Sequence, residues 1–329
     1  MSPELDLPEP LAPADSPDPD DGGRREIDLR VGFGLFASEN QLDSLLSIAR
    51  RVDVESGQVL YTRGEPMTTL FQVIVGHVEV QAPELPSWHV RDGGAVGLID
   101  FSLGRAQSRT ALATSPSQMI ELDAADYRDY LEDNFEVCHR IVAQLSGRLM
   151  ADMITDPARF LTREAEHEAG HEAGHEARTY AKVEIPLVER LIMMARMPAF
   201  RGTSTQALAN LAQSAIERRF APDEVIEEAG TTTKLVSLLV EGTIELVLPY
   251  GRARRSGRGF VAHVEELAVG PRRSTAIAVT PAIVLQLERD DLIDRIEEHF
   301  DLGMTLLAFV AAEQERVNEA SSTGNCRVA

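Results

Sequence analysis

Hydrophobic residues along the chain follow two periods, one of about 3.6 residues and one of two, in an order that occurs twice. The pattern opens with apolar residues at helical spacing, which predicts helices over residues 40–50 and 206–217. Short segments typical of β-strands follow at 58–61, 70–75, 77–81, 224–227, 236–240 and 243–248. Helical spacing returns over 126–131, 135–153, 291–300 and 302–317. The same order of elements is therefore predicted for both halves.

The residues repeat along with this pattern. A shift of about 166 residues overlays the halves as far as Gly76 and Gly242, and a shift of about 165 then places TALA at 110–113 on TAIA at 275–278. The matching pairs are Leu42 with Leu208, Leu45 with Leu211, Ala49 with Ala215, Val59 with Val225, Gly64 with Gly230, Pro116 with Pro281, Leu122 with Leu287, Asp126 with Asp291 and Phe135 with Phe300. The chain therefore contains two copies of one unit of about 120–140 residues.

Each unit is predicted to be a small antiparallel barrel flanked by helices, because a helix, many short strands and further helices follow one another. The expected fold class is α+β and mainly β, with two β-roll barrels of jelly-roll type. Gly76 and Gly242 lie between adjacent predicted strands, where a tight turn or bulge requires a residue that adopts positive φ. We expect the two units to span residues 25–162 and 183–319.

Three polar segments surround these units. Residues 1–24 are rich in Pro, Asp, Glu and Ala and are expected to form a disordered acidic arm, while 320–329 form a tail. Residues 163–182 repeat His-Glu-Ala-Gly and match the zinc-binding HExxH pattern twice. The repeated glycines and the lack of an apolar face favour a polar linker over a metalloprotease site. We therefore expect no metal.

The net charge of the chain limits the classes of partner that it is expected to bind. Asp and Glu number 53 against 32 Lys and Arg, a net charge of −21, which argues against general nucleic-acid binding. The arginine-rich run at 250–260 is expected in a solvated loop between strands, with nucleic acid or an acidic partner as alternatives. The apolar run at 306–312 is far shorter than a membrane helix, which needs ~20 residues. With no secretory signal and only Cys138 and Cys326, we expect a cytoplasmic protein without disulfides.

The sequence resembles the cyclic-nucleotide-binding domain, the β-roll of the catabolite activator protein and of protein kinase A regulatory subunits. The resemblance is carried by SGQVLYTRGEPMTTLFQVIVGHVEV in the first unit and APDEVIEEAGTTTKLVSLLVEGTIELV in the second. It covers both units, about 260 of the 329 residues. It implies a phosphate-binding cassette in each unit. There, amides at a short helix N-terminus and an arginine hold the cyclic phosphate, and a glutamate accepts the ribose hydroxyl.

The first cassette, residues 96–111, has lost both chemical anchors. Leu98 occupies the position of the glutamate and Gln107 that of the arginine. Arg109 lies two residues beyond Gln107, on the same face of a strand, and is a candidate for a relocated phosphate contact. The alternative is a solvated surface arginine or one paired with Asp100. The candidate ligand-binding residues of this unit are Gly97, Gln107, Ser108 and Arg109.

The second cassette keeps more of the pattern. Glu266-Leu267-Ala268 matches Glu-Leu-Ala and Pro271-Arg272 matches Pro-Arg. The interval between the two matches is about three residues too short for the helix that cradles the phosphate, and Glu265 replaces a glycine. The candidate residues are Glu266, Leu267, Ala268, Arg272, Arg273 and Thr275. The resemblance implies cAMP or cGMP as the ligand, with a domain that binds no ligand as the alternative.

No catalytic constellation is present, so we expect a non-catalytic regulatory, sensor or adaptor protein whose protein partner the sequence does not name. A bacterial transcription regulator is disfavoured, because a helix-turn-helix of ~60 residues is not visible after residue 317. A regulatory subunit of a separate enzyme or transporter is the other alternative. The stripe Val142, Leu145, Leu149 and Met153 predicts either a homodimer seam or packing within the chain.

A protein consisting of residues 25–162 is expected not to bind cAMP or cGMP, because Leu98 and Gln107 cannot supply the ribose and phosphate anchors. Isothermal titration calorimetry tests this, with residues 183–319 as the matched comparison. A micromolar dissociation constant for the first unit would overturn the assignment of its anchors.

Overall fold

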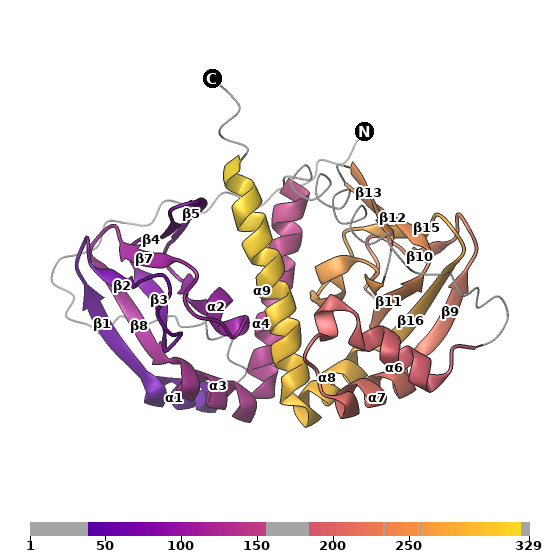
Figure 1. The fold of residues 1–329 in the computed structure, drawn as a ribbon, viewed down its shortest axis with the longest axis horizontal. Helices are drawn as coiled ribbons and strands as arrows, with labels where there is room; N and C mark the ends of the chain where they lie inside the picture. The colour runs from indigo at the N-terminus through magenta and orange to yellow at the C-terminus, as the bar shows by residue number, and fades with distance from the viewer. Residues whose placement is uncertain (1–38, 156–183, 233, 250, 257, 324–329) are drawn as a thin grey trace, which may run out of the picture.

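The computed structural model describes residues 39–155, 184–232, 234–249, 251–256 and 258–323. These residues form two units that lie on either side of a pair of long helices (Figure 1). The acidic arm, the histidine repeat and the end of the tail lie outside the described residues, so the expectations for those segments stay predictions.

The first unit is a roll of two four-stranded antiparallel sheets with helices at its ends. Its strands are ordered β1-β8-β3-β6 in one sheet and β2-β7-β4-β5 in the other. Its elements are α1 (Glu39–Ile48), β1 (Ala49–Val54), β2 (Val59–Tyr61), β3 (Thr69–Val75), β4 (Val78–Ala82), β5 (Leu85–Val90), β6 (Ala95–Val96), α2 (Leu98–Ser102), β7 (Thr110–Ala113), β8 (Ser117–Asp123), α3 (Ala124–Asp133) and α4 (Phe135–Thr155).

The second unit repeats this topology. Its sheets are ordered β14-β11-β16-β9 and β10-β15-β12-β13, so each strand of the first unit has a counterpart with the same neighbours. Its elements are α6 (Leu187–Ala195), η1 (Pro198–Phe200), α7 (Thr205–Ser214), β9 (Ile216–Phe220), β10 (Val225–Glu227), β11 (Leu235–Glu241), β12 (Thr243–Leu248), β13 (Gly251–Ser256), β14 (Gly259–Phe260), η2 (His263–Leu267), β15 (Thr275–Ala278), β16 (Ala282–Glu288), α8 (Arg289–Glu298) and α9 (Phe300–Thr323). The predicted fold class, with two antiparallel rolls, is confirmed.

Two glycines fix the turns that the sequence pattern located. Gly76 has φ 126° and Gly242 has φ 104°, a region that other residues avoid. A Cβ atom at Gly76 would lie 2.0 Å from Ser117 Oγ, and one at Gly242 would lie 2.5 Å from the carbonyl oxygen of Pro281. Both positions therefore require glycine for conformation and for space.

Three predicted elements differ from the structure. The helix predicted over residues 206–217 ends at Ser214, because Ile216 begins strand β9. The first helix ends at Ile48 rather than at residue 50, because Ala49 begins strand β1, which pairs with β8 over six residues. The arginine-rich run was expected in a loop, yet residues 251–256 form β13, paired with β12. This strand lies at the edge of its sheet, where charged side chains are common because one edge faces solvent. Arg252 accordingly pairs with Glu245 on β12 at 2.9 Å.

Helices α4 and α9 pack against each other between the two units (Figure 1). Their buried apolar residues join one core that runs through both units. At Gly303 a Cβ atom would lie 3.3 Å from Cys138 Sγ, so a small residue permits this close approach of the helices. The stripe predicted as a seam is thus covered within the chain at Val142 and Leu149, while a homodimer remains untested.

Each long helix also crosses to the opposite unit. Helix α9, which follows the second roll, contacts α2 and β5 of the first unit. Helix α4, which follows the first roll, contacts η2 of the second unit. The C-terminal helix of each unit therefore lies over the cassette of the other.

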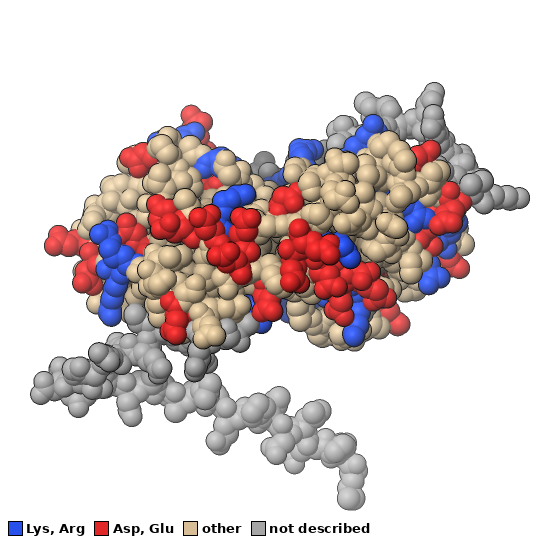
Figure 2. All heavy atoms as spheres, turned by 90° about the horizontal axis from the view of Figure 1, so that it is seen from below, with Lys and Arg blue, Asp and Glu red and all other residues tan. Residues whose placement is uncertain are grey.

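Acidic side chains gather on the face seen from below in Figure 2, which is the side of α3 and α8 in Figure 1. Exposed carboxylates on these two helices are Asp126, Asp129, Glu132, Asp133, Asp290, Asp294, Glu297 and Glu298. Such a surface repels a phosphate backbone. Among the described helices, none combines the length and the apolar character that crossing a bilayer requires.

Leu149→Glu is expected to lower the free energy of unfolding by about 3 kcal/mol or more, because Leu149 is 1% exposed in the α4–α9 seam. Arg148→Glu, on the exposed side of the same helix, is the control and should change stability by less than about 0.5 kcal/mol. Urea denaturation measures both. Light scattering should give the same mass for wild type and variant. If instead Leu149→Glu halves the mass without loss of stability, the seam lies between two chains.

Candidate functional site

The first cassette is organised around a buried aspartate rather than a ligand anchor. Gly97, with φ 91°, starts the five-residue helix α2, which places Asp100 inside the cassette. Asp100 Oδ1 accepts a hydrogen bond from Arg105 Nε at 2.6 Å, and its Oδ2 accepts two at 3.0 Å from the amide and hydroxyl of Ser108. Ser108, a predicted ligand-binding residue, is therefore bound to Asp100.

Arg109 is neither solvated nor paired with Asp100, so that alternative is wrong. Its side chain is 1% exposed and its guanidinium carbon lies 3.9 Å from the centre of the Trp88 ring. It donates to the carbonyl oxygen of Pro86 at 2.7 Å and to Glu319 Oε1 at 3.3 Å. Glu319 belongs to α9, so the acidic partner comes from the end of the chain, which no local spacing could indicate.

The two positions that lost their anchors are occupied by uncharged groups. Leu98 packs against the hydrophobic core. Gln107 is buried and donates from Nε2 to Met67 Sδ at 2.8 Å, while its Oε1 has no hydrogen-bond partner. Gln107 and Arg109 thus lie in the same cassette, but only Arg109 brings a charge to it.

The second cassette begins with one turn of 3₁₀-helix where the family pattern has an α-helix. This turn, η2, contains Glu265 and Glu266, and the backbone becomes extended at Ala268. Gly270 follows with φ 123° and leads into Pro271 and Arg272. The shortened interval in the sequence therefore corresponds to the loss of the α-helix. Without it, its row of free amides is not available for a phosphate.

Arg272 and Glu266, the two predicted anchors, bind each other. Arg272 Nη2 lies 3.0 Å from Glu266 Oε2 and also forms an ion pair with Glu227 of β10. Glu227 Oε1 in turn accepts a hydrogen bond of 2.5 Å from the Ser237 hydroxyl. Sequence comparison missed Glu227, although its place on an inward-facing strand position is a usable signal. The guanidinium is thus already neutralised by two carboxylates.

Glu266 is fully buried and tightly held. Its carboxylate accepts hydrogen bonds from the amides of Ser237 at 3.0 Å and Ala262 at 3.2 Å. Burial raises the pKa of Glu266 to about 8, against the opposing effect of these amides and of the Arg289 charge. Burial likewise lowers the pKa of Arg272 to about 10. The raised pKa of Glu266 is consistent with one guanidinium facing two carboxylates, because a single positive charge balances only one of them.

The remaining predicted residues of this cassette hold its backbone. Burial raises the pKa of Glu265, whose carboxylate accepts hydrogen bonds from the Arg273 amide and the Ser274 hydroxyl. Thr275 Oγ1 accepts from the amide of Ala229 at 3.1 Å. Leu267 is buried in the core, and the side chain of Arg273 is exposed.

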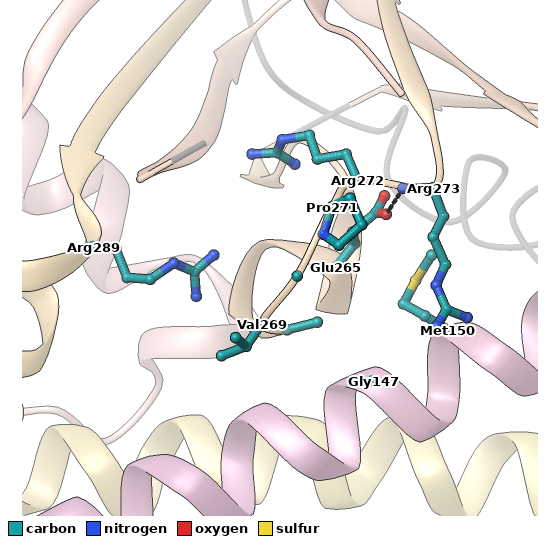
Figure 3. Close-up of a pocket in the computed structure, with 10 residues that line it drawn as sticks. Gly147, Met150, Glu265, Val269, Pro271, Arg272, Arg273 and Arg289 are labelled. Carbon is teal, nitrogen blue, oxygen red and sulfur yellow. Dashed lines mark hydrogen bonds between the residues drawn. The ribbon is translucent and has the colours of Figure 1, made fainter. Parts of the chain in front are cut away.

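A small cavity lies between the second cassette and helix α4 (Figure 3). Its volume is about 40 Å³, enough for a few water molecules, whereas ligand pockets usually measure ~300–1,000 Å³. The lining residues are Gly147, Met150, Glu265, Ala268, Val269, Gly270, Pro271, Arg272, Arg273 and Arg289. A Cβ atom at Gly147 would meet nothing within 4 Å. The cavity as it stands does not fit a cyclic nucleotide, and the contribution of these residues to ligand binding stays a prediction.

Glu266→Gln is expected to change the pH dependence of stability. Because the folded-state pKa of Glu266 is raised from 4.5 to about 8, its favourable contribution is complete below pH 4.5 and is lost as the pH rises to about 8. The variant lacks this loss. The free energy of unfolding of the variant, relative to that of wild type, should therefore increase by about 1–3 kcal/mol between pH 5 and pH 8. Urea denaturation at several pH values, with exposed Glu228→Gln as control, measures this. Parallel profiles would contradict a protonated Glu266.

Comparison with known proteins agrees with this architecture. Residues 217–299, which run from β9 to α8, match the family model of the cyclic nucleotide-binding domain. A protein of Rhodopseudomonas palustris, named as a candidate potassium channel, is 25% identical over 122 residues, which are 36% of this chain and 30% of that protein. The chain thus spans less than a third of this curated relative.

Two solved structures have a similar course. One is the regulatory subunit of a cAMP-independent protein kinase A from Trypanosoma brucei (14% identity, TM-score 0.33, covering 83% of this chain and 86% of that one). Another is the regulatory domain of Toxoplasma gondii protein kinase A, solved with cAMP (14%, 0.30, 82% and 89%). At these TM-scores the likeness supports no conclusion about ligands. Residues 217–299 of the second unit thus match the cyclic nucleotide-binding domain family, and the first unit repeats the strand order of the second.

Proposed function

We propose that this protein is a non-catalytic regulatory or sensor protein in which the second unit responds to the ligand. Domains of this family generally regulate other activities rather than catalyse reactions. The observation that supports the proposal most strongly is the reciprocal crossing of the long helices, with α4 over the second cassette and α9 over the first. A conformational change at either cassette therefore acts on a helix that belongs to the other unit.

This arrangement suits the transmission of a binding event. Gly147 and Met150 of α4 line the cavity beside Arg272 and Arg273 (Figure 3). A ligand that enlarges this cavity must displace α4, which is packed along α9. The ligand then favours one arrangement of the two helices over another by its difference in affinity for them.

The proposed ligand is a cyclic mononucleotide of the cAMP or cGMP type. Arg272 would pair with its phosphate and Glu266 would accept a ribose hydroxyl, as the family pattern implies. The phosphate must replace a carboxylate on Arg272, because Glu227 and Glu266 already neutralise the guanidinium. Proton uptake by Glu266, whose pKa is raised to about 8, would reduce this competition at neutral pH.

An adaptor that binds no nucleotide is the competing function. The internal carboxylates at Arg272 and the small cavity favour it. Regulation of a separate enzyme or transporter fits either function. Reading of DNA through the face formed by α3 and α8 is disfavoured, because that face is acidic (Figure 2).

Differential scanning fluorimetry of the full chain with cAMP and cGMP separates the two functions. A sensor is stabilised by the ligand, by about 2.7 kcal/mol at a hundredfold excess over the dissociation constant. Arg272→Ala should abolish that stabilisation, although it leaves two carboxylates buried and lowers the stability of the fold.

Gly147→Leu therefore serves as a second variant, because it fills the cavity without removing a charge. Gly147→Ala is its control, since it leaves most of the cavity and favours the helix by about 0.5–1 kcal/mol. Binding that is lost in Gly147→Leu and kept in Gly147→Ala supports the sensor. A wild-type protein whose melting temperature neither nucleotide raises is an adaptor.

A further inference from the structure

Two arginines of the first cassette are held in place by their own unit. Asp100 Oδ1 binds Arg105 Nε at 2.6 Å, and Arg105 Nη2 also lies 3.2 Å from Ser108 Oγ. Arg109 is held by the Trp88 ring and by a carbonyl oxygen. Both guanidinium groups are therefore positioned before any distant residue reaches them.

Their remaining partners come from α9. Glu315 Oε1 accepts from Arg105 Nη2 at 2.5 Å, and Glu319 Oε1 accepts from Arg109 Nη2 at 3.3 Å. Each pair is separated by 210 residues in the sequence. Glu315 and Glu319 are four residues apart and so project from one side of the helix, with Cβ atoms about 5–6 Å apart. The two carboxylates match the two arginines.

The site is not saturated by these carboxylates. Arg109 is 1% exposed, yet its Nε atom has no hydrogen-bond partner. The neighbouring Gln107 is 3% exposed and its Oε1 atom is also unpartnered. A buried guanidinium with an unused donor favours an anion that offers more acceptor atoms than Glu319 provides.

The second unit shows that carboxylates are not required to pack a long helix on a cassette. The shift that places Phe135 on Phe300 also places Met150 on Glu315. Met150 lies against the second cassette together with Gly147, and neither carries a charge. The acidic residues of α9 are thus a particular feature of its contact with the first cassette.

We propose that the first cassette is a two-arginine anion site that α9 closes with Glu315 and Glu319, and that a ligand with two separated phosphoryl groups binds there when α9 withdraws. The tethered carboxylates compete at a high effective concentration, so the external ligand binds weakly to the closed protein. This site uses other residues and another ligand than the second cassette, so the failure of this proposal would leave the proposed sensor function untouched.

Isothermal titration calorimetry of the full chain with inorganic tripolyphosphate tests the proposal. The double variant Glu315→Gln/Glu319→Gln should bind the probe at least tenfold more tightly than wild type. The control Glu132→Gln/Glu297→Gln makes the same change in net charge at exposed positions of α3 and α8 and should leave the affinity unchanged. The affinity for orthophosphate, which has a single phosphoryl group, should increase much less in the double variant than the affinity for tripolyphosphate.

A further substitution locates the gain. Adding Arg105→Gln to the double variant should return the affinity to the wild-type value, while the melting temperature confirms that the protein is folded. Equal tripolyphosphate affinity in wild type, double variant and control overturns the proposal, as does a gain that survives Arg105→Gln. If the double variant does not fold, Glu319→Gln alone should bind the probe at least threefold more tightly, and no gain there also overturns it.

Discussion

The burial of α4 against α9 is the interaction on which the arrangement of the protein depends. A single apolar core runs from one roll to the other through these helices, so neither unit is placed independently of the other. A side chain at Gly303 would meet Ile296 of α8 and Cys138 of α4, so the glycine leaves the room that this packing requires. Beyond this seam, each helix continues over the opposite cassette. The side chains that the helix places against the cassette therefore contribute to the chemistry of that cassette.

Both cassettes then face the same electrostatic constraint, which is that a buried guanidinium must be balanced. The second unit meets it locally, with Glu227 and Glu266 around Arg272. The first unit meets it from a distance, with Glu319 of α9 reaching Arg109. Removing Glu319 would leave the buried Arg109 without a carboxylate, which is more costly than the net gain from the pair, whereas Arg272 keeps one carboxylate when the other is removed. In the first unit, electrostatic balance therefore links the cassette to α9 in addition to the packing of that helix.

Sequence reasoning recovered what local spacing encodes. The internal repeat, six of the helices, three strands of each unit, and the turns at Gly76 and Gly242 follow from periodicity and from glycine's backbone freedom. It failed where a partner is remote or an environment overrides a pattern. The acidic partner of Arg109 lies 210 residues away, and strand β13 carries arginines because it is an edge strand. The pairing of Glu266 with Arg272 was also missed, because the family pattern assigns both residues to a ligand and does not indicate a contact between them.

The difference between Met150 and Glu315 means that the two cassettes do not have equivalent surroundings. A dimer of identical subunits must present the same residue at both equivalent positions, and its two sites then share one affinity and are able to bind cooperatively. Fusion of the two units in one chain removes that symmetry, so one cassette carries a methionine and the other a glutamate. The two cassettes of this chain are therefore not equivalent, so the sequence around each is free to diverge toward a different chemistry.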